Sequence, residues 1–267
     1  MQCLRSIRGF ALGLAAFAAL GTVGCGGEAD DDAETIQSAI TVENALSANA
    51  LSANALSANA LSANALSANA LSANALSANA LTATALRDPL AREFLKYVVS
   101  CALDEDQEIV MRIDHKRYAF PGSLGLAPEW GTPQGSCDGE CQRWVSACVL
   151  ARVDAAGVKR VISLRGAHGA LKPEHSELRR FPDREATYYG NVFMAGQPMF
   201  MCLSPGEHSN ERVCGDSLAN CPMEVVGSCD VACDDEGPYR SFSDCSDRGR
   251  AGRGRTYHES ITVFLPK

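Results

Sequence analysis

The sequence lacks three features that would place the protein in a common functional class. The formal net charge is −8, so no excess of positive charge attracts nucleic acid or an anionic membrane. No hydrophobic run reaches the roughly 20 residues that a membrane-spanning helix needs. Neither the His-Glu-x-x-His motif of zinc proteases nor the Gly-x-Ser-x-Gly motif of serine hydrolases occurs. We therefore expect no nucleic-acid partner, no spanning helix and no familiar catalytic set.

The first 24 residues have the form of an export signal. Arg5 and Arg8 give a positively charged start, and an apolar run from Phe10 to Leu20 follows. Positive charge, a short apolar core and small residues at the end are typical of a secretory signal peptide. We therefore expect residues 1–24 to be removed on export.

The signal ends at a cysteine in a recognisable setting. Thr22-Val23-Gly24-Cys25 resembles the lipobox of bacterial lipoproteins, whose cysteine receives diacylglycerol, although most members have Leu at the position of Thr22. The resemblance implies that Cys25 anchors the chain to a membrane through its lipid. Gly26, where Asp would mark retention at the inner membrane, implies the outer membrane, on its periplasmic side or at the cell surface. An ordinary signal peptide, with Cys25 in a disulfide, is the alternative.

Residues 25–43 form an acidic linker, and a five-residue repeat fills residues 44–87. Asn-Ala-Leu-Ser-Ala occurs seven times in succession, followed by Asn-Ala-Leu-Thr-Ala and a degenerate copy. A period of five matches neither a helix, with about 3.6 residues per turn, nor a strand, with about two. The spacing is similar to that of pentapeptide-repeat proteins, which form four-sided solenoids, but the Asn-to-Leu register differs by one residue. We prefer a weakly structured spacer that holds the folded domain away from the lipid, with a short solenoid as the alternative.

The remaining residues, 88–267, are enough for one domain with its own core. This segment holds an even number of cysteines, which in an exported chain predicts that all are paired in disulfides. The ten are Cys101, Cys137, Cys141, Cys148, Cys202, Cys214, Cys221, Cys229, Cys233 and Cys245. The closest pairs are separated by three residues, whereas zinc sites more often use two, so we predict no metal site and no cofactor. The spacing leaves the pairing open.

Two helices and several strands predict an α+β fold. Residues 88–101 begin with Asp88 as N-cap, and residues 139–153 repeat the pattern of one apolar face that carries cysteines. Cys141 and Cys148 lie two turns apart and should join the second helix to different neighbours. Strand patterns cover 108–113, 160–164, 187–193, 199–203 and 256–265. Because strands and helices do not alternate regularly, we predict a single disulfide-rich α+β domain with a mostly antiparallel sheet. Residues 204–250 hold five cysteines and many Asp, Gly, Ser and Pro residues, which indicates an irregular lobe held by disulfides.

Several polar groups are candidates for chemistry. His168, Glu174, His175 and Glu177 lie close together in the sequence and could form an acid–base pair or a weak metal site. Ser123 lies in a Gly-rich turn that lacks the spacing of a nucleophile elbow. For each group, solvated loop residues are the preferred interpretation.

Two charged clusters near the end of the chain have alternative interpretations. Asp230, Asp234, Asp235 and Glu236 could bind calcium, although their spacing is not that of an EF-hand. The arginines Arg248, Arg250, Arg253 and Arg255 alternate with glycines and could contact anionic sugars or lipid headgroups. His258 and Glu259 are neighbours on a predicted strand, so they should point to opposite faces and form no dyad.

The lipobox, the pentad tandem and the segments CQRWVSACVLARV, VISLRG and YYGNVF together resemble uncharacterised exported proteins of myxobacteria. This resemblance implies the cellular address and the two-part layout, and it implies no activity. The sequence favours a surface-displayed binding or structural module on a flexible lipidated tether, with an envelope, glycan or protein ligand. The alternative is a secreted hydrolase that uses His168, Glu174 or His175.

Overall fold

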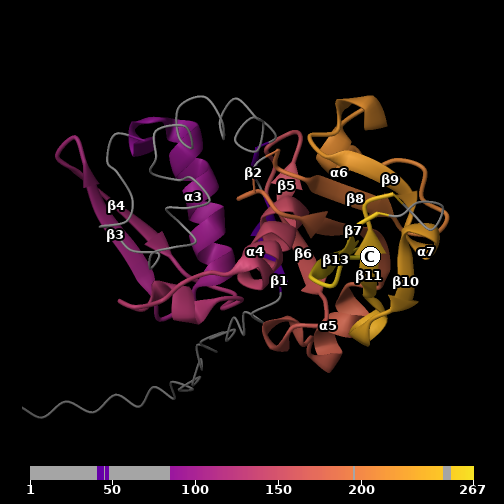
Figure 1. The fold of residues 1–267 in the computed structure, drawn as a ribbon. Helices are drawn as coiled ribbons and strands as arrows, with labels where there is room; N and C mark the ends of the chain where they lie inside the picture. Colours follow the sequence, from indigo (N-terminus) through magenta and orange to yellow (C-terminus); the bar gives the residue numbers. More distant parts are fainter. Residues whose placement is uncertain (1–40, 45, 48–84, 195, 249–253) are drawn as a thin grey trace, which may run out of the picture. The chain divides into compact units, whose positions relative to one another are not determined.

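The computed structural model describes residues 41–44, 46–47, 85–194, 196–248 and 254–267, which Figure 1 draws as coloured ribbon. The export signal, the lipid-acceptor Cys25 and most of the repeat lie outside the described residues, and the predictions about them stay predictions. In the part of the chain that is described, no helix is both long and apolar enough to cross a membrane.

A six-stranded sheet organises the fold. Its strands, in spatial order, are β1 (Thr41–Asn44), β6 (Arg160–Arg165), β13 (Ser260–Leu265), β7 (Asp183–Gly190), β8 (Met199–Leu203) and β9 (Glu224–Ser228). Neighbouring strands are antiparallel except β8 and β9, which run parallel. Together with the helices, this sheet confirms the predicted α+β class and the mostly antiparallel pairing.

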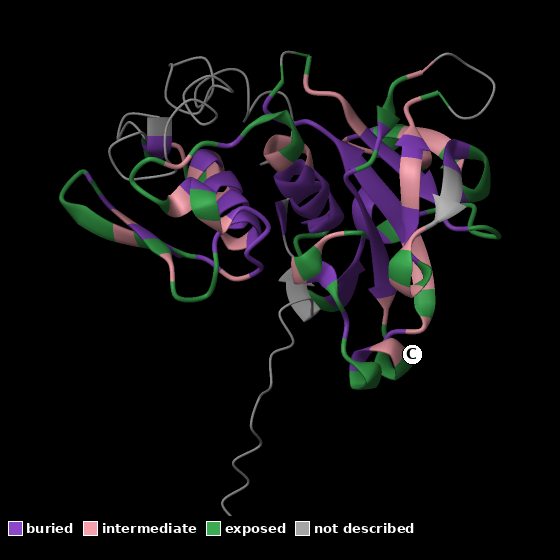
Figure 2. Cartoon of the chain, turned by 60° about the horizontal axis from the view of Figure 1, so that its bottom comes forward, coloured by how far each residue is buried: buried purple, intermediate pink, exposed green. Residues whose placement is uncertain are grey.

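Two long helices pack beside the sheet. They are α3 (Pro89–Ala102) and α4 (Gly139–Ala151). Asp88 caps α3 by accepting from the amide of Leu90, and Asp138 caps α4 by accepting from the amide of Cys141. The face of α4 contacts β7 and β13, and α3 packs against α4. Figure 2 shows that α3 has both buried and exposed positions, whereas α4 is buried at every position from Trp144 to Ala151, more completely than one apolar face predicted.

Smaller elements complete the fold. β3 (Glu108–Ile113) and β4 (Lys116–Pro121) form a hairpin. β2 (Leu46–Ser47) and β5 (Val153–Asp154) form a short parallel pair. A second sheet consists of β10 (Cys233–Glu236), β11 (Phe242–Ser246) and β12 (Thr256–Tyr257). Short helices are α5 (His175–Arg180), α6 (Glu211–Cys214) and α7 (Cys229–Ala232), with single 3₁₀ turns at Ala85–Arg87 (η2), Pro128–Gly131 (η3), Gly169–Leu171 (η4), Leu218–Asn220 (η5) and Pro238–Arg240 (η6).

The folded unit takes in both ends of the repeat. Leu46, in the first pentad, and Leu86, in the last degenerate copy, are both fully buried in the main core. β1 pairs with β6 at the edge of the large sheet. The folded unit therefore includes described residues that precede Asp88, where we placed the start of the domain. Residues 48–84 of the predicted spacer lie outside the described residues.

Two hydrophobic cores lie on opposite faces of the large sheet. Successive side chains of a strand point to opposite faces. Thus Tyr188 and Met201 join the main core with α4, whereas Tyr189 and Cys202 join the second core. The second core also takes residues from the β10–β11–β12 sheet and from α7. The large sheet is therefore the middle layer.

Five disulfides join all ten cysteines of the domain, as predicted. The pairs are Cys101–Cys148, Cys137–Cys141, Cys202–Cys229, Cys214–Cys221 and Cys233–Cys245. Cys148 links α4 to α3. Cys141, however, pairs with a residue four positions earlier, so it closes a local loop and does not join α4 to another element.

Two strand predictions need correction. The predicted lobe of 204–250 is more regular than expected, because β9, β10 and β11 lie within it. The predicted strand of 256–265 is two strands, β12 and β13, in two different sheets. The break between the two strands falls at His258 and Glu259, whose side chains contact different partners.

Candidate functional site

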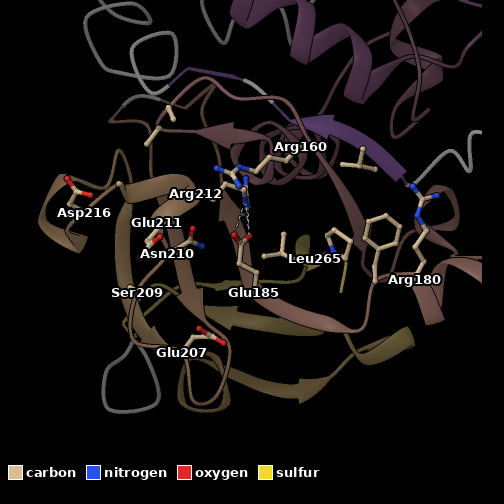
Figure 3. Close-up of a pocket in the computed structure, with 16 residues that line it drawn as sticks. Arg160, Arg180, Glu185, Glu207, Ser209, Asn210, Glu211, Arg212, Asp216 and Leu265 are labelled. Carbon is tan, nitrogen blue, oxygen red and sulfur yellow. Dashed lines mark hydrogen bonds and ion pairs between the residues drawn. The ribbon is translucent and has the colours of Figure 1, made fainter.

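A cavity of about 980 Å³ opens where five segments meet: the β5–β6 turn, the end of α5, β7, the turn around α6 and the chain end after β13 (Figure 3). Cavities of this size accommodate small ligands or short peptides. Its lining is mixed, with aliphatic and aromatic groups such as Phe181 and Leu265 beside charged side chains.

The wall of the cavity is fixed by the guanidinium of Arg212. Its Nε and Nη2 donate to the carboxylate of Glu185 at 2.9 and 2.5 Å. Nη1 donates to the carbonyl oxygens of Ala151 and Val153 at 2.9 and 2.6 Å. Nη2 also donates to the hydroxyl of Tyr188 at 2.9 Å. All five N–H groups of this side chain are thereby used, and the buried ion pair is fully hydrogen-bonded.

The same network sets the protonation states of its members. Burial raises the pKa of Tyr188 far above its usual range, so the phenol stays neutral. Burial alone would lower the pKa of Arg212, but the neighbouring Glu185 carboxylate raises it overall, so the guanidinium stays charged. Asn210 donates to the phenol oxygen at 3.0 Å and also caps α6. Because every hydrogen-bond donor of Arg212 is already used, this network suits a structural role in the cavity wall better than a role in a chemical reaction.

Further charged side chains lie around the cavity. Figure 3 shows Arg160 and Arg180 on one side of the cavity and Glu207 and Asp216 on the other, with Leu265 between the two sides. Arg160 also pairs with Asp154 at 3.2 Å, and the guanidinium of Arg180 lies over a neighbouring ring. The cavity therefore has arginines towards one side and carboxylates towards the other, with Leu265 and the paired Arg212 and Glu185 between them.

A second buried cation lies outside the cavity. The guanidinium of Arg165 lies 3.6 Å from the centroid of the Phe264 ring and donates to the carbonyl oxygen of Phe181 at 2.6 Å. Burial lowers the pKa of Arg165 to about 10, and the nearby charge of Glu177 opposes this fall. Because Arg165 connects three segments and reaches no solvent, its role is structural.

The structure keeps the predicted histidine candidates apart. The Nδ1 of His168 accepts from the amide of Ala170 at 3.2 Å, and its ring lies 5.2 Å from the ring of Trp144. Burial lowers the pKa of His168. Glu174 and His175 are exposed. Within the described part of the chain, no hydrogen bond or ion pair joins His168 to either of them, so no acid–base pair forms there.

The other predicted neighbours also have separate partners. Arg143 binds Glu259 through two hydrogen bonds of 2.6 and 2.7 Å, and hydrogen bonding to this carboxylate raises the pKa of the guanidinium. His258 contacts the carboxylate of Asp244 at the surface. His258 and Glu259 thus have separate partners, although they lie between β12 and β13 and not on one strand as predicted. Ser123 lies in a turn packed against the end of α3, where its amide donates to the carbonyl oxygen of Leu103 at 2.7 Å.

The two charged clusters are described only in part. Asp230 accepts from the hydroxyl of Ser228, while the side chains of Asp234, Asp235 and Glu236 lie outside the described residues. The amides of Arg248 and Arg255 donate to Ser246 and Asp247, and Arg250 and Arg253 also lie outside the description. The calcium and polyanion interpretations stay predictions.

Three sulfur atoms meet in the second core. Those of Cys202, Cys233 and Cys245 lie within 4.8 Å of one another. Each belongs to a disulfide, Cys202 with Cys229 and Cys233 with Cys245. A disulfide sulfur is not the thiolate that a metal binds, so the oxidised cluster is a structural element.

Sequence reasoning missed the residues of the cavity. Arg212, Glu185 and Tyr188 belong to no motif, and their separation along the chain hides their contact. One local signal was present, since Asn210 followed by an acidic residue, Glu211, is typical of a helix N-terminus. No family model, curated protein or solved structure matches this chain. The cavity therefore has to be interpreted from its own chemistry.

Proposed function

We propose that the protein is an exported, lipid-anchored binding module whose ligand enters the cavity beside Arg212. The observation that carries this proposal is the separation of charge across the cavity, with arginines on one side and carboxylates on the other. Opposite charges placed on opposite walls favour a ligand that carries both charges, because each end meets its complement.

The lining favours binding over catalysis. Among the described residues around the cavity there is neither a histidine nor a cysteine, and the only hydroxyl side chain is that of Ser209. A general base within hydrogen-bond reach of a nucleophile is what hydrolysis would require. Arg212 and Glu185 are engaged with each other and give the cavity a fixed shape, which lowers the entropic cost of binding.

The chemistry of the cavity fits a short peptide with free ends. A carboxylate terminus suits the side of Arg160 and Arg180, and an amino terminus suits the side of Glu207 and Asp216. Apolar side chains of the peptide would cover Leu265 and its neighbours, whose contact with water is lost on binding. Peptides with free ends are therefore the ligand class that we favour over glycans or larger proteins.

The address of the protein belongs to the same proposal. Five disulfides are compatible with an exported protein. The anchor on Cys25 and the outer-membrane location rest on the lipobox resemblance. One acyl chain alone gives only reversible attachment, whereas a diacylglycerol supplies two, so a module anchored in this way would retain its peptide ligand at the envelope.

The proposal is tested with tripeptides such as Ala-Leu-Ala, in free and end-blocked forms, by thermal unfolding of the protein. At a ligand concentration about 100 times its dissociation constant, binding stabilises the fold by about 2.7 kcal/mol, which raises Tm by roughly 5 to 10 °C. We expect this shift for the free peptide and its loss when acetyl and amide groups remove the end charges.

Arg180→Ala and Arg179→Ala form a matched pair for the same experiment. Both arginines are exposed on α5, but only Arg180 lines the cavity. The shift should fall in Arg180→Ala and persist in Arg179→Ala. Equal shifts with blocked and free peptides, or in both variants, would refute the peptide site, and cleavage of the peptide detected by mass spectrometry would favour a hydrolase instead.

A further inference from the structure

The first pentad of the repeat occupies a built site in the main core. The side chain of Leu46 is fully buried, and its amide donates to the carbonyl oxygen of Arg152 at 3.1 Å. β2 runs parallel to β5, with Leu46 opposite Val153. β2 also contacts α3 (Figure 1). A buried leucine with a paired backbone is therefore what this site holds.

The site has a rigid frame. The guanidinium of Arg152 donates to the hydroxyl of Ser100 on α3 at 2.8 Å, and it lies over the ring of Tyr97 at 4.8 Å. The disulfide Cys101–Cys148 joins α3 to α4 one residue further along. The frame thus persists whichever segment lies in it, because none of these contacts involves the repeat.

The bound segment is not unique in the chain. Asn44-Ala45-Leu46-Ser47 is followed by six further copies of Asn-Ala-Leu-Ser and one of Asn-Ala-Leu-Thr. Each copy offers the same leucine and the same backbone spacing. β1, just before the site, is an edge strand that pairs with β6 on one side only. Edge pairing is made by backbone groups, so it accepts different sequences. Within the seven identical copies of the repeat, a shift by one whole pentad restores the same residue type at every position.

We propose that this site is a receptor for the Asn-Ala-Leu-Ser segment, and that any copy in the repeat can occupy it. Moving one copy along releases five residues on the N-terminal side and removes five from the chain between the site and Leu86. The release lengthens the connection to Cys25 by at most roughly 17 Å per step, at about 3.4 Å per residue. The repeat then adjusts the reach of the tether in fixed steps. This proposal is independent of the peptide cavity.

The test compares three full-length variants by thermal unfolding. The first carries Leu46→Ala alone, and the second adds alanine at the seven remaining repeat leucines. Those leucines are Leu51, Leu56, Leu61, Leu66, Leu71, Leu76 and Leu81. The third is the matched control, which has these seven substitutions and keeps Leu46. Emptying a leucine site in a core of this size lowers Tm by roughly 5 to 15 °C.

We expect the full fall in Tm only in the second variant. Leu46→Ala alone should lower Tm by less than half of that amount, and the control variant should keep the Tm of the original protein. Hydrogen exchange gives an independent readout in Leu46→Ala: slow exchange should move from the amide of residue 46 to that of Leu51. Equal losses of Tm in the first two variants, with Leu51 still in fast exchange, would overturn the proposal. If the second variant does not fold, the exchange measurement on the first decides alone.

Discussion

The main core and the second core differ in the types of residue that form them. The main core lies between α3, α4 and the large sheet and consists mostly of aliphatic side chains. The second core has nine buried residues, of which four are cysteines in two disulfides and four are aromatic. A cluster so small removes little apolar area from water, and small cores usually need covalent links. Three disulfides also lie in or against the main core, but its many aliphatic side chains supply most of its buried surface, whereas nearly half of the second core is cysteine.

The two sides of the sheet also differ in how far their ion pairs are buried. On the main-core side, Arg212 and Glu185 are almost inaccessible, with 4% and 9% of their side chains exposed. Beside the second core, the pair of His258 and Asp244 is largely exposed. A buried pair loses far more when one partner is removed than an exposed pair does. The next three experiments test this contrast, from the largest expected effect to the smallest.

Arg212→Leu should lower the free energy of unfolding by about 3–5 kcal/mol, because it leaves Glu185 as an uncompensated buried charge. Guanidinium denaturation without reductant measures the loss. The double variant Arg212→Leu with Glu185→Leu should recover part of it. A loss no greater than that of the exposed Arg179→Leu would show that the buried pair is not a main-core element.

Replacing Cys202 and Cys229 with alanine should cost roughly 3.5 kcal/mol, since this disulfide closes a loop of 27 residues. The matched change at Cys137 and Cys141, four residues apart, should cost roughly 2 kcal/mol. Hydrogen exchange should also distinguish the two cores. In the variant without Cys202–Cys229, the amides of β9 to β11 should exchange faster while those of α4 stay protected. Uniform opening of both cores would mean that they form one cooperative unit.

His168 should make the main core sensitive to mild acid. Burial lowers its pKa in the folded state, so the unfolded chain binds a proton more readily. The stabilisation is complete above the unfolded pKa of about 6.5 and is lost as the pH falls towards the folded pKa. We expect urea unfolding between pH 7 and pH 5 to show a shallower pH dependence in His168→Gln. The exposed His175→Gln is the control and should match the original protein.

Local patterns predicted the two long helices and six of the thirteen strands in the described residues. α3 and α4 could be found because each has an Asp cap and an apolar face, and both signals depend on residues close in sequence. β3 and β8 followed from runs of apolar residues. β4 was missed because its segment, Lys116–Pro121, is largely exposed and begins with two charged residues. Its turn at Asp114 and His115, both with positive φ, was the available signal.

The cavity and the disulfide pairing could not be predicted in the same way. Arg180, Glu185 and Arg212 line one cavity only because the fold places the end of α5, β7 and α6 around it. That placement is a property of the whole fold, and periodicity within one segment carries no information about it. The partner of Cys141 shows the same limit: its place on an apolar face was clear, but the nearest cysteine in space was one turn away in the preceding loop.

The burial of Leu46 and Leu86 has a consequence for inheritance. Tandem copies of one coding unit are readily gained or lost in whole units when a gene is replicated. Since Leu46 and Leu86 are both buried in the same core, a gain or loss of whole pentads would change the length of chain that joins them. The entropy of closing a chain between fixed ends costs only about 0.6 kcal/mol more for each doubling of its length. The fold thus tolerates alleles with different copy numbers, while the number of interchangeable pentads changes.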